Sequence, residues 1–128
     1  MSLFKNVFGN SEEENKTPKV SWKLLTNSDE LITIIKESNT KPIVIFKHST
    51  RCGISRMVLR QFEKDFNSHD TITPYFLDLL NYRELSNEVA SRFEVAHQSP
   101  QLLVIKKGIA VHNASHESID ATILNDFI

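Results

Sequence analysis

The strongest fold signal in this sequence is the segment Pro42-Ile43-Val44-Ile45-Phe46, which runs on through Lys47-His48-Ser49-Thr50-Arg51 to Cys52 and Gly53. A continuous β-branched and aromatic run of this length is typical of a central strand covered on both faces. The apolar residues then step by three and four, which predicts a helix with one buried stripe: Ile54, Met57, Val58, Phe62 and Phe66. The segment therefore predicts a strand-to-helix unit with Cys52 at the junction.

The patterns on either side extend this unit into an alternation of strands and helices. Upstream, residues 20–25 predict a short strand, and Asn27 with Glu30 predicts a capping box for a helix that ends near Ser38. Downstream, residues 75–80 predict a strand, and Asn81 with Glu84 is expected to cap a helix that ends near Phe93.

The C-terminal third predicts a hairpin and a last helix. Residues 102–105 and 109–111 flank Lys106-Lys107-Gly108, which is typical of a hairpin turn, and residues 119–127 predict a short amphipathic helix. The order βαβαβα followed by ββα is that of a thioredoxin-like α/β domain, with a mixed central sheet and helices on both faces. Alternation alone also fits other small α/β folds.

Length and composition fit one ordinary domain. The chain has 128 residues, of which 40% are apolar and 24% charged. Ser11 to Pro18 (SEEENKTP) is polar and closed by proline, so we expect a flexible N-terminal tail over 1–18 and the compact domain over 19–128. Within the tail, four apolar residues fit either a docking or membrane-surface stripe or a loosely packed end, and we favour the second: Leu3, Phe4, Val7 and Phe8.

Charge and hydropathy exclude several classes of protein. A net charge of −1 argues against nucleic acid as a partner, and the absence of a long apolar run argues against a membrane span. The first nine residues are too short and too interrupted for a signal peptide, which predicts a cytoplasmic protein. Cys52 is the single cysteine, so any disulfide that it forms must be with another molecule.

Cys52 occupies a position that favours chemistry. A thiol at a helix N-terminus is stabilised as the thiolate, which is the reactive form. The window from Lys41 to Phe62 contains no acidic residue, and its five basic residues would favour the thiolate and attract an anionic thiol: Lys41, Lys47, Arg51, Arg56 and Arg60. Arg56 and Arg60 also fit a solvated helix face, whereas Arg51, next to the sulfur in sequence, is expected to have a functional role.

Two further residues belong to the predicted site. Ser55 stands where a two-cysteine oxidoreductase has its resolving cysteine, so a mixed disulfide on Cys52 must wait for an external thiol. Ser99-Pro100 precedes the fourth main strand. Taken alone it favours an ordinary trans turn, but the thioredoxin-like order predicts a cis proline that faces the thiol, with the backbone before it pairing with substrate.

The residues His48-Ser49-Thr50-Arg51-Cys52-Gly53-Ile54-Ser55-Arg56 resemble the active-site region of the monothiol bacilliredoxins, the YtxJ-like proteins of the bacillithiol system. Ser99-Pro100-Gln101, the stretch from Val111 to His116, and Trp22 match the same family, and the resemblance covers roughly residues 20–126. It implies a thioredoxin-like cytoplasmic enzyme that removes bacillithiol from protein mixed disulfides, with Cys52 as nucleophile.

The resemblance also implies the partners. They are S-thiolated client proteins and a low-molecular-weight thiol, with bacillithiol as co-substrate, and no metal or resident cofactor. The expected substrate-binding residues are Arg51, Gly53, Ser55, Ser99 and Pro100.

One departure keeps alternatives open. The family has proline after the cysteine and threonine before it, where this chain has Gly53 and Arg51. Cys52-Gly53-Ile54-Ser55 is one residue from the CGFS of monothiol glutaredoxins, which bind glutathione and can share a [2Fe–2S] cluster. Their Gly-Gly-x-Asp is missing, since Asn113-Ala114-Ser115-His116 stands there, so we rank bacilliredoxin first. A non-catalytic thioredoxin-like interaction domain is the third possibility.

Four other polar residues invite a functional interpretation. His112 and His116 have a metal-like spacing, but nothing completes a site, so we interpret them as surface or site-edge residues. His97 precedes the proline loop and fits either a residue that lines the crevice or a solvated loop histidine, and we favour the second. Asp78 is expected to end its strand and either face the crevice or bind its own loop.

Overall fold

The computed structural model describes residues 20–128. The predicted tail and its apolar residues lie outside these residues, and the domain boundary at residue 19 stays a prediction. Within these residues five strands form one sheet: β2 (Lys23–Leu24), β3 (Ile43–His48), β4 (Thr73–Asp78), β5 (Gln101–Lys106) and β6 (Ile109–Ser115). The same part of the chain contains three α-helices and two 3₁₀ segments: α2 (Ser28–Glu37), α3 (Gly53–Asp65), α4 (Arg83–Phe93), η1 (His116–Ser118) and η2 (Ala121–Phe127).

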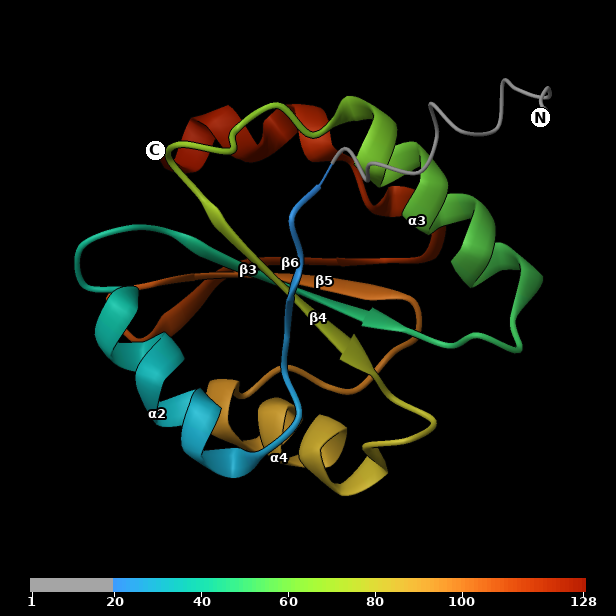
Figure 1. The fold of residues 1–128 in the computed structure, drawn as a ribbon, viewed down its shortest axis with the longest axis horizontal. Coiled ribbons are helices and arrows are strands. Elements are labelled where there is room, and N and C mark those ends of the chain that lie inside the picture. Colours follow the sequence, from blue (N-terminus) through green and yellow to red (C-terminus); the bar gives the residue numbers. More distant parts are fainter. Residues whose placement is uncertain (1–19) are drawn as a thin grey trace, which may run out of the picture.

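The sheet is mixed, as the alternation predicted. Its strand order is β2-β4-β3-β5-β6, in which β2, β4 and β3 are parallel while β5 and β6 add antiparallel pairs. Figure 1 shows α3 and the C-terminal segment on one face of the sheet, and α2 and α4 on the other. The α/β class and the mixed sheet are therefore confirmed.

Strand β3 is central and every one of its residues is buried. Val44 and Phe46 pack in the cluster under α3, whereas Ile43 and Ile45 pack in the cluster under α2 and α4. Since side chains alternate along a strand, His48 continues the α3 face and Lys47 continues the opposite face. The two polar residues at the end of β3 are thus buried on opposite sides of the sheet.

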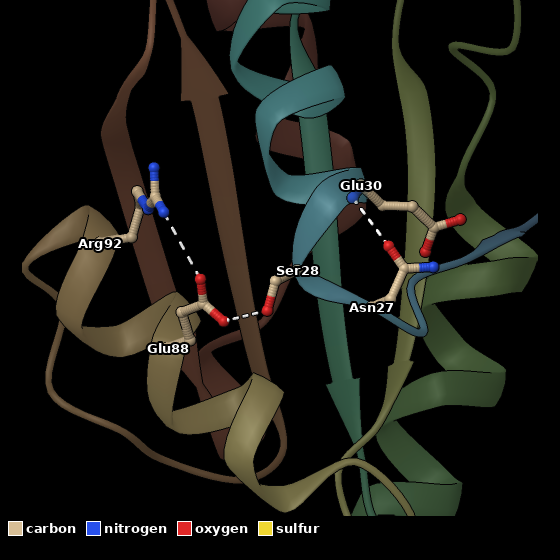
Figure 2. A network of polar contacts seen from close by, with 5 residues as sticks. All are labelled: Asn27, Ser28, Glu30, Glu88 and Arg92. Carbon is tan, nitrogen blue, oxygen red and sulfur yellow. Dashed lines mark hydrogen bonds and ion pairs between the residues drawn. The ribbon is translucent and has the colours of Figure 1, made fainter.

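The start of α2 matches the capping prediction and ties this helix to α4. Asn27 is the N-cap, and its Oδ1 accepts the N–H of Glu30 at 3.1 Å. Figure 2 shows a second link, in which the Ser28 hydroxyl donates to Glu88 (2.6 Å), which also pairs with Arg92 (3.4 Å). These exposed contacts join the two helices that cover one face of the sheet.

Three local predictions were wrong. The first strand is shorter than predicted, at two residues, and the last helix is 3₁₀ rather than α. Asn81 does not cap α4, which begins after Tyr82 without a side-chain cap. The amide of Asn81 donates instead to Asp78 (2.8 Å), so it closes the loop after β4.

Candidate functional site

Cys52 lies at the carboxyl end of β3 and is the N-cap residue of α3. Its N–H donates to Ser49 O at 3.2 Å, and its carbonyl accepts the N–H of Arg56 at 3.1 Å. The thiol is free and its residue is half-buried. The first turn of α3 contains no acidic residue, so the partial positive charge of the helix end is not offset there. This end of α3 is therefore suited to an anionic group beside Cys52.

The basic block around Cys52 is smaller than the sequence predicted. Lys41 precedes β3 at the opposite end of the strand, and Lys47 is fully buried on the face away from α3. Arg51 is exposed and directly precedes Cys52 in the chain. Arg56 is also exposed, but it has a specific contact, because its guanidinium donates to Thr50 O at 2.9 Å. Arg51 and Arg56 therefore supply the nearby positive charge, and Arg60 lies one turn further along α3.

Ser55 is part of the scaffold under the thiol loop. It is fully buried, its Oγ lies 2.7 Å from His48 Nδ1, and it accepts the N–H of Ser49 at 3.1 Å. Burial is the main cause that lowers the pKa of His48. The negative charge of Asp78 opposes this shift, and the positive charge of Arg56 lowers the pKa further. A neutral His48 and the Ser55 hydroxyl thus fix the start of the loop. A fully buried Ser55 has no exposed surface for a ligand, so it fits a scaffold role better than direct contact.

Ser99 and Pro100 lie at the same end of the sheet. The Ser99–Pro100 peptide bond is cis, as the thioredoxin-like order predicted. Gln101, which follows it, pairs with Lys47 in the β3–β5 ladder, so Pro100 lies next to the end of β3. The Pro100 carbonyl accepts the N–H of His116 at 3.0 Å, which puts His116 at the edge of the site. Ser99 Oγ is buried and has no hydrogen-bond partner in residues 20–128.

Two apolar residues near the start of α3 are exposed, which corrects the predicted buried stripe. Ile54 and Met57 are 42% and 53% exposed, whereas Val58 and Phe62 are buried. Gly53 has space beside it, since an added Cβ would meet only the Arg56 guanidinium, at 3.8 Å. These two apolar side chains therefore face solvent rather than the core.

Sequence reasoning missed a buried polar cluster behind this end of the sheet. Lys47 Nζ donates to Ser86 O (3.1 Å) and lies 3.2 Å from His97 Nδ1. Burial lowers the pKa of Lys47 to about 8. Burial also lowers the pKa of His97, and the positive charges of Lys47 and Arg83 lower it further. His97 is a half-buried loop residue, so the prediction of a solvated loop histidine holds only in part. Its contact with Lys47 was missed, because a strand pattern gives no sign of which loop will cover a lysine.

The remaining polar residues have structural roles. Asp78 accepts from Leu80 N (3.2 Å) and from Asn81, so it binds its own loop, one of its two predicted alternatives. The His112 ring packs on Phe127, with centroids 5.3 Å apart. Within residues 20–128, His, Cys, Asp and Glu side chains form no group of three suited to a metal ion. In the same part of the chain, each helix is too short or too polar to cross a membrane.

Comparison with known families decides the assignment. A profile described as Monothiol bacilliredoxin BrxC matches residues 23–124, which include the thiol, the cis proline and the hairpin. The chain belongs to the monothiol bacilliredoxin family. The resemblance drawn from His48–Arg56 is therefore confirmed, and Cys52, the single cysteine of the chain, lies within the matched residues.

Solved structures confirm the thioredoxin fold of this bacilliredoxin. A thioredoxin-fold protein for which an oxidoreductase activity has been suggested aligns with a TM-score of 0.70 and 31% identity, covering 80% of this chain and 89% of the other. Mitochondrial thioredoxin 3 from Saccharomyces cerevisiae (0.66, 22%, covering 88% and 97%) and the thioredoxin of Malassezia sympodialis (0.66, 21%, covering 87% and 90%) share the fold. Family and fold together indicate a thiol–disulfide oxidoreductase.

Proposed function

We propose that this bacilliredoxin removes bacillithiol, or a similar low-molecular-weight thiol, from protein mixed disulfides through Cys52. The observation that carries the proposal is the pairing of one accessible thiol with a serine at the resolving position. Cys52 is half-buried at the N-terminus of α3, while Ser55 is buried and already bonded to Ser49 and His48. A hydroxyl cannot attack a disulfide, so each turnover needs a thiol from outside.

The chemistry is two thiol–disulfide exchanges. In the first, the Cys52 thiolate attacks the bacillithiol sulfur of the mixed disulfide, a new S–S bond forms to Cys52, and the client leaves as a thiolate that takes up a proton. In the second, the thiolate of another bacillithiol molecule attacks the bacillithiol sulfur on Cys52. The products are the disulfide of the small thiol and a regenerated Cys52 thiolate, so the client is reduced and the second bacillithiol molecule is oxidised.

Residues around Cys52 suit the two parts of such a substrate. Bacillithiol bears malate carboxylates, which the exposed guanidinium of Arg51 and the uncapped N–H groups of the first turn, beginning at Gly53, are suited to bind. The backbone of Ser99, before the cis Pro100, makes no hydrogen bond within the described residues and is suited to pair with an extended client. The exposed apolar Ile54 and Met57 lie on the helix that begins at this thiol and are available for contact with a client.

The proposal extends to the partners and the compartment. The partners are S-thiolated client proteins and the small thiol as co-substrate, with neither nucleic acid nor a membrane involved. We place the reaction in the cytoplasm during oxidative stress, because a lone reactive thiol stays reduced there until mixed disulfides form on other proteins.

Intact mass spectrometry tests the proposal. After incubation with oxidised bacillithiol, the wild type is expected to gain one bacillithiol adduct, while Cys52→Ala gains none. Oxidised glutathione is the matched small-thiol comparison. Equal labelling of wild type and Cys52→Ala, or labelling of neither, would show that Cys52 does not perform this exchange. A shared [2Fe–2S] cluster would instead give a brown protein with visible absorbance.

A further inference from the structure

The buried cluster behind the site connects two strands to one loop. The loop comprises residues 94–100 and leads from α4 to the cis proline. Lys47 on β3 and Gln101 on β5 are paired directly across the ladder, so their side chains lie on the same face of the sheet. Both residues are almost completely buried, at 0% and 1% exposed.

Each of these side chains binds one of two consecutive loop residues. Gln101 Nε2 donates to Ala96 O at 3.0 Å, and Lys47 Nζ lies 3.2 Å from His97 Nδ1. Lys47 also donates to Ser86 O, which anchors it to α4. An ammonium group only donates, so Nδ1 of His97 accepts and its ring proton is on Nε2. These contacts therefore hold the loop against the sheet at Ala96 and His97, shortly before Ser99.

Core packing does not explain a lysine at this position. Ile43 and Ile45 precede it on the same face of β3, and an apolar residue would continue their pattern. Within residues 20–128 no carboxylate pairs with Lys47, and a buried ammonium without such a partner is costly. Lys47 therefore weakens the core and at the same time binds the loop that leads to Ser99–Pro100. Its presence is better explained by its effect on the position of that loop.

We propose that Lys47 and Gln101 clamp the loop 94–100 and thereby fix Ser99–Pro100 at the place where the substrate disulfide meets Cys52. Lys47 and His97 are then positioning residues, since neither contacts the reacting sulfur atoms. The inference rests on one part of the proposed function, which is that a disulfide substrate lies along this loop. It does not depend on which small thiol is transferred.

Hydrogen–deuterium exchange of the whole protein tests the clamp without any substrate. Lys47→Met keeps most of the side-chain volume but removes the ammonium, and His97→Ala removes the loop side of the contact. Both should speed exchange of the Glu94 and Val95 amides, which donate to Ala90 O, by about tenfold or more, with little change in α3. His97→Asn, whose amide oxygen can accept from Lys47, should restore slow exchange. Lys41→Met, at the other end of β3, is the matched control and should exchange like the wild type.

Two reactions of Cys52 then separate positioning from an effect on the thiol. The rate with a symmetrical disulfide of a short cysteine peptide should fall by about tenfold in Lys47→Met and His97→Ala. The rate with iodoacetamide should change by less than about twofold. Unchanged loop exchange in both variants, or an equal fall in both reactions, would overturn the proposal. If Lys47→Met does not fold, the comparison of His97→Ala with His97→Asn decides it. A wild type that exchanges with the peptide disulfide but not with bacillithiol would refute the proposed function alone.

Discussion

The hydroxyl of Ser55 lies 2.7 Å from Nδ1 of His48, beneath the loop that carries the thiol. The same oxygen accepts the N–H of Ser49, and both side chains are buried. The residue that replaces a resolving cysteine therefore has a structural task. The Ser55 side chain joins the end of β3 to the first turn of α3. The same side chain therefore determines both the shape of the loop and the absence of a second thiol.

Removing this hydroxyl should destabilise the protein. Ser55→Ala leaves two buried polar groups, the Ser49 N–H and His48 Nδ1, without their partner, and we expect a loss of about 1–3 kcal/mol in the free energy of unfolding. Urea unfolding followed by the fluorescence of Trp22, which packs on Phe46 and Phe62, measures it. Ser86→Ala, another buried serine, is a useful comparison. A change below about 0.5 kcal/mol would mean that the Ser55 contacts contribute little.

Introducing a thiol at the same place should change the route of the reaction. Cys52 and residue 55 are three apart at the start of α3, which puts them on neighbouring positions of one helix face. In Ser55→Cys the second thiol is expected to displace the small thiol from Cys52, so that an internal disulfide accumulates instead of the adduct. Intact mass spectrometry distinguishes the two products. Persistence of the adduct at the wild-type level would show that residue 55 cannot reach the Cys52 sulfur.

Gly53 should be replaceable. Its backbone is outside the left-handed region, and its added Cβ would have ordinary contact distances. Gly53→Ala should raise the free energy of unfolding by about 0.4–1 kcal/mol, because alanine has less conformational freedom in the unfolded chain. Proline is also suited to this first helical position. Destabilisation by Gly53→Ala in thermal unfolding would contradict the relaxed geometry.

Lys47 should make stability depend on alkaline pH. Its ordinary pKa is 10.5, and burial lowers the pKa of Lys47 to about 8 in the folded protein. Below pH 8 both folded and unfolded states hold the proton, and the fold bears a buried charge. Above it, only the unfolded state still binds the proton, so stability should rise by about 2 kcal/mol toward pH 10.

Lys47→Met should remove this rise, and urea titrations of both proteins from pH 7 to about pH 10 measure the difference. Tyr75 sets the upper limit of this pH range. Burial and the neighbouring Glu37 raise the pKa of Tyr75 above its ordinary value of 10.0, so above pH 10 its contribution to stability falls. Parallel curves for wild type and Lys47→Met would contradict the account. The proposed clamp also predicts that Lys47→Met loosens the 94–100 loop. Removal of the buried charge should therefore stabilise the whole fold while the loop itself becomes less stable.

Much of the fold follows from local pattern. The run Pro42–Phe46 predicted the central strand, and the polar Asn27 predicted the start of α2, because both signals are contained in a few neighbouring residues. Ile54 and Met57 were misplaced in the buried stripe because helical spacing does not tell where a helix extends past the sheet that it covers.

The candidate site was predicted in part. Cys52 at a helix start and the cis Pro100 followed from the order of elements. The basic block was overestimated because summing charge along the chain ignores the alternation of β3, which turns Lys47 away from α3 and into the core. Its partners, Ser86 and His97, are 39 and 50 residues away in sequence, so no local pattern could reveal the cluster.

The central claim is that Cys52 takes a small thiol from a client protein and keeps it until another thiol arrives. The most direct test mixes the protein with a purified client carrying bacillithiol on one cysteine and follows both intact masses. We expect the client to lose its adduct while the wild type gains one, and we expect Cys52→Ala to leave the client modified. A client that stays modified in the presence of wild type, or a lasting disulfide between client and Cys52 in place of the adduct, would contradict this claim.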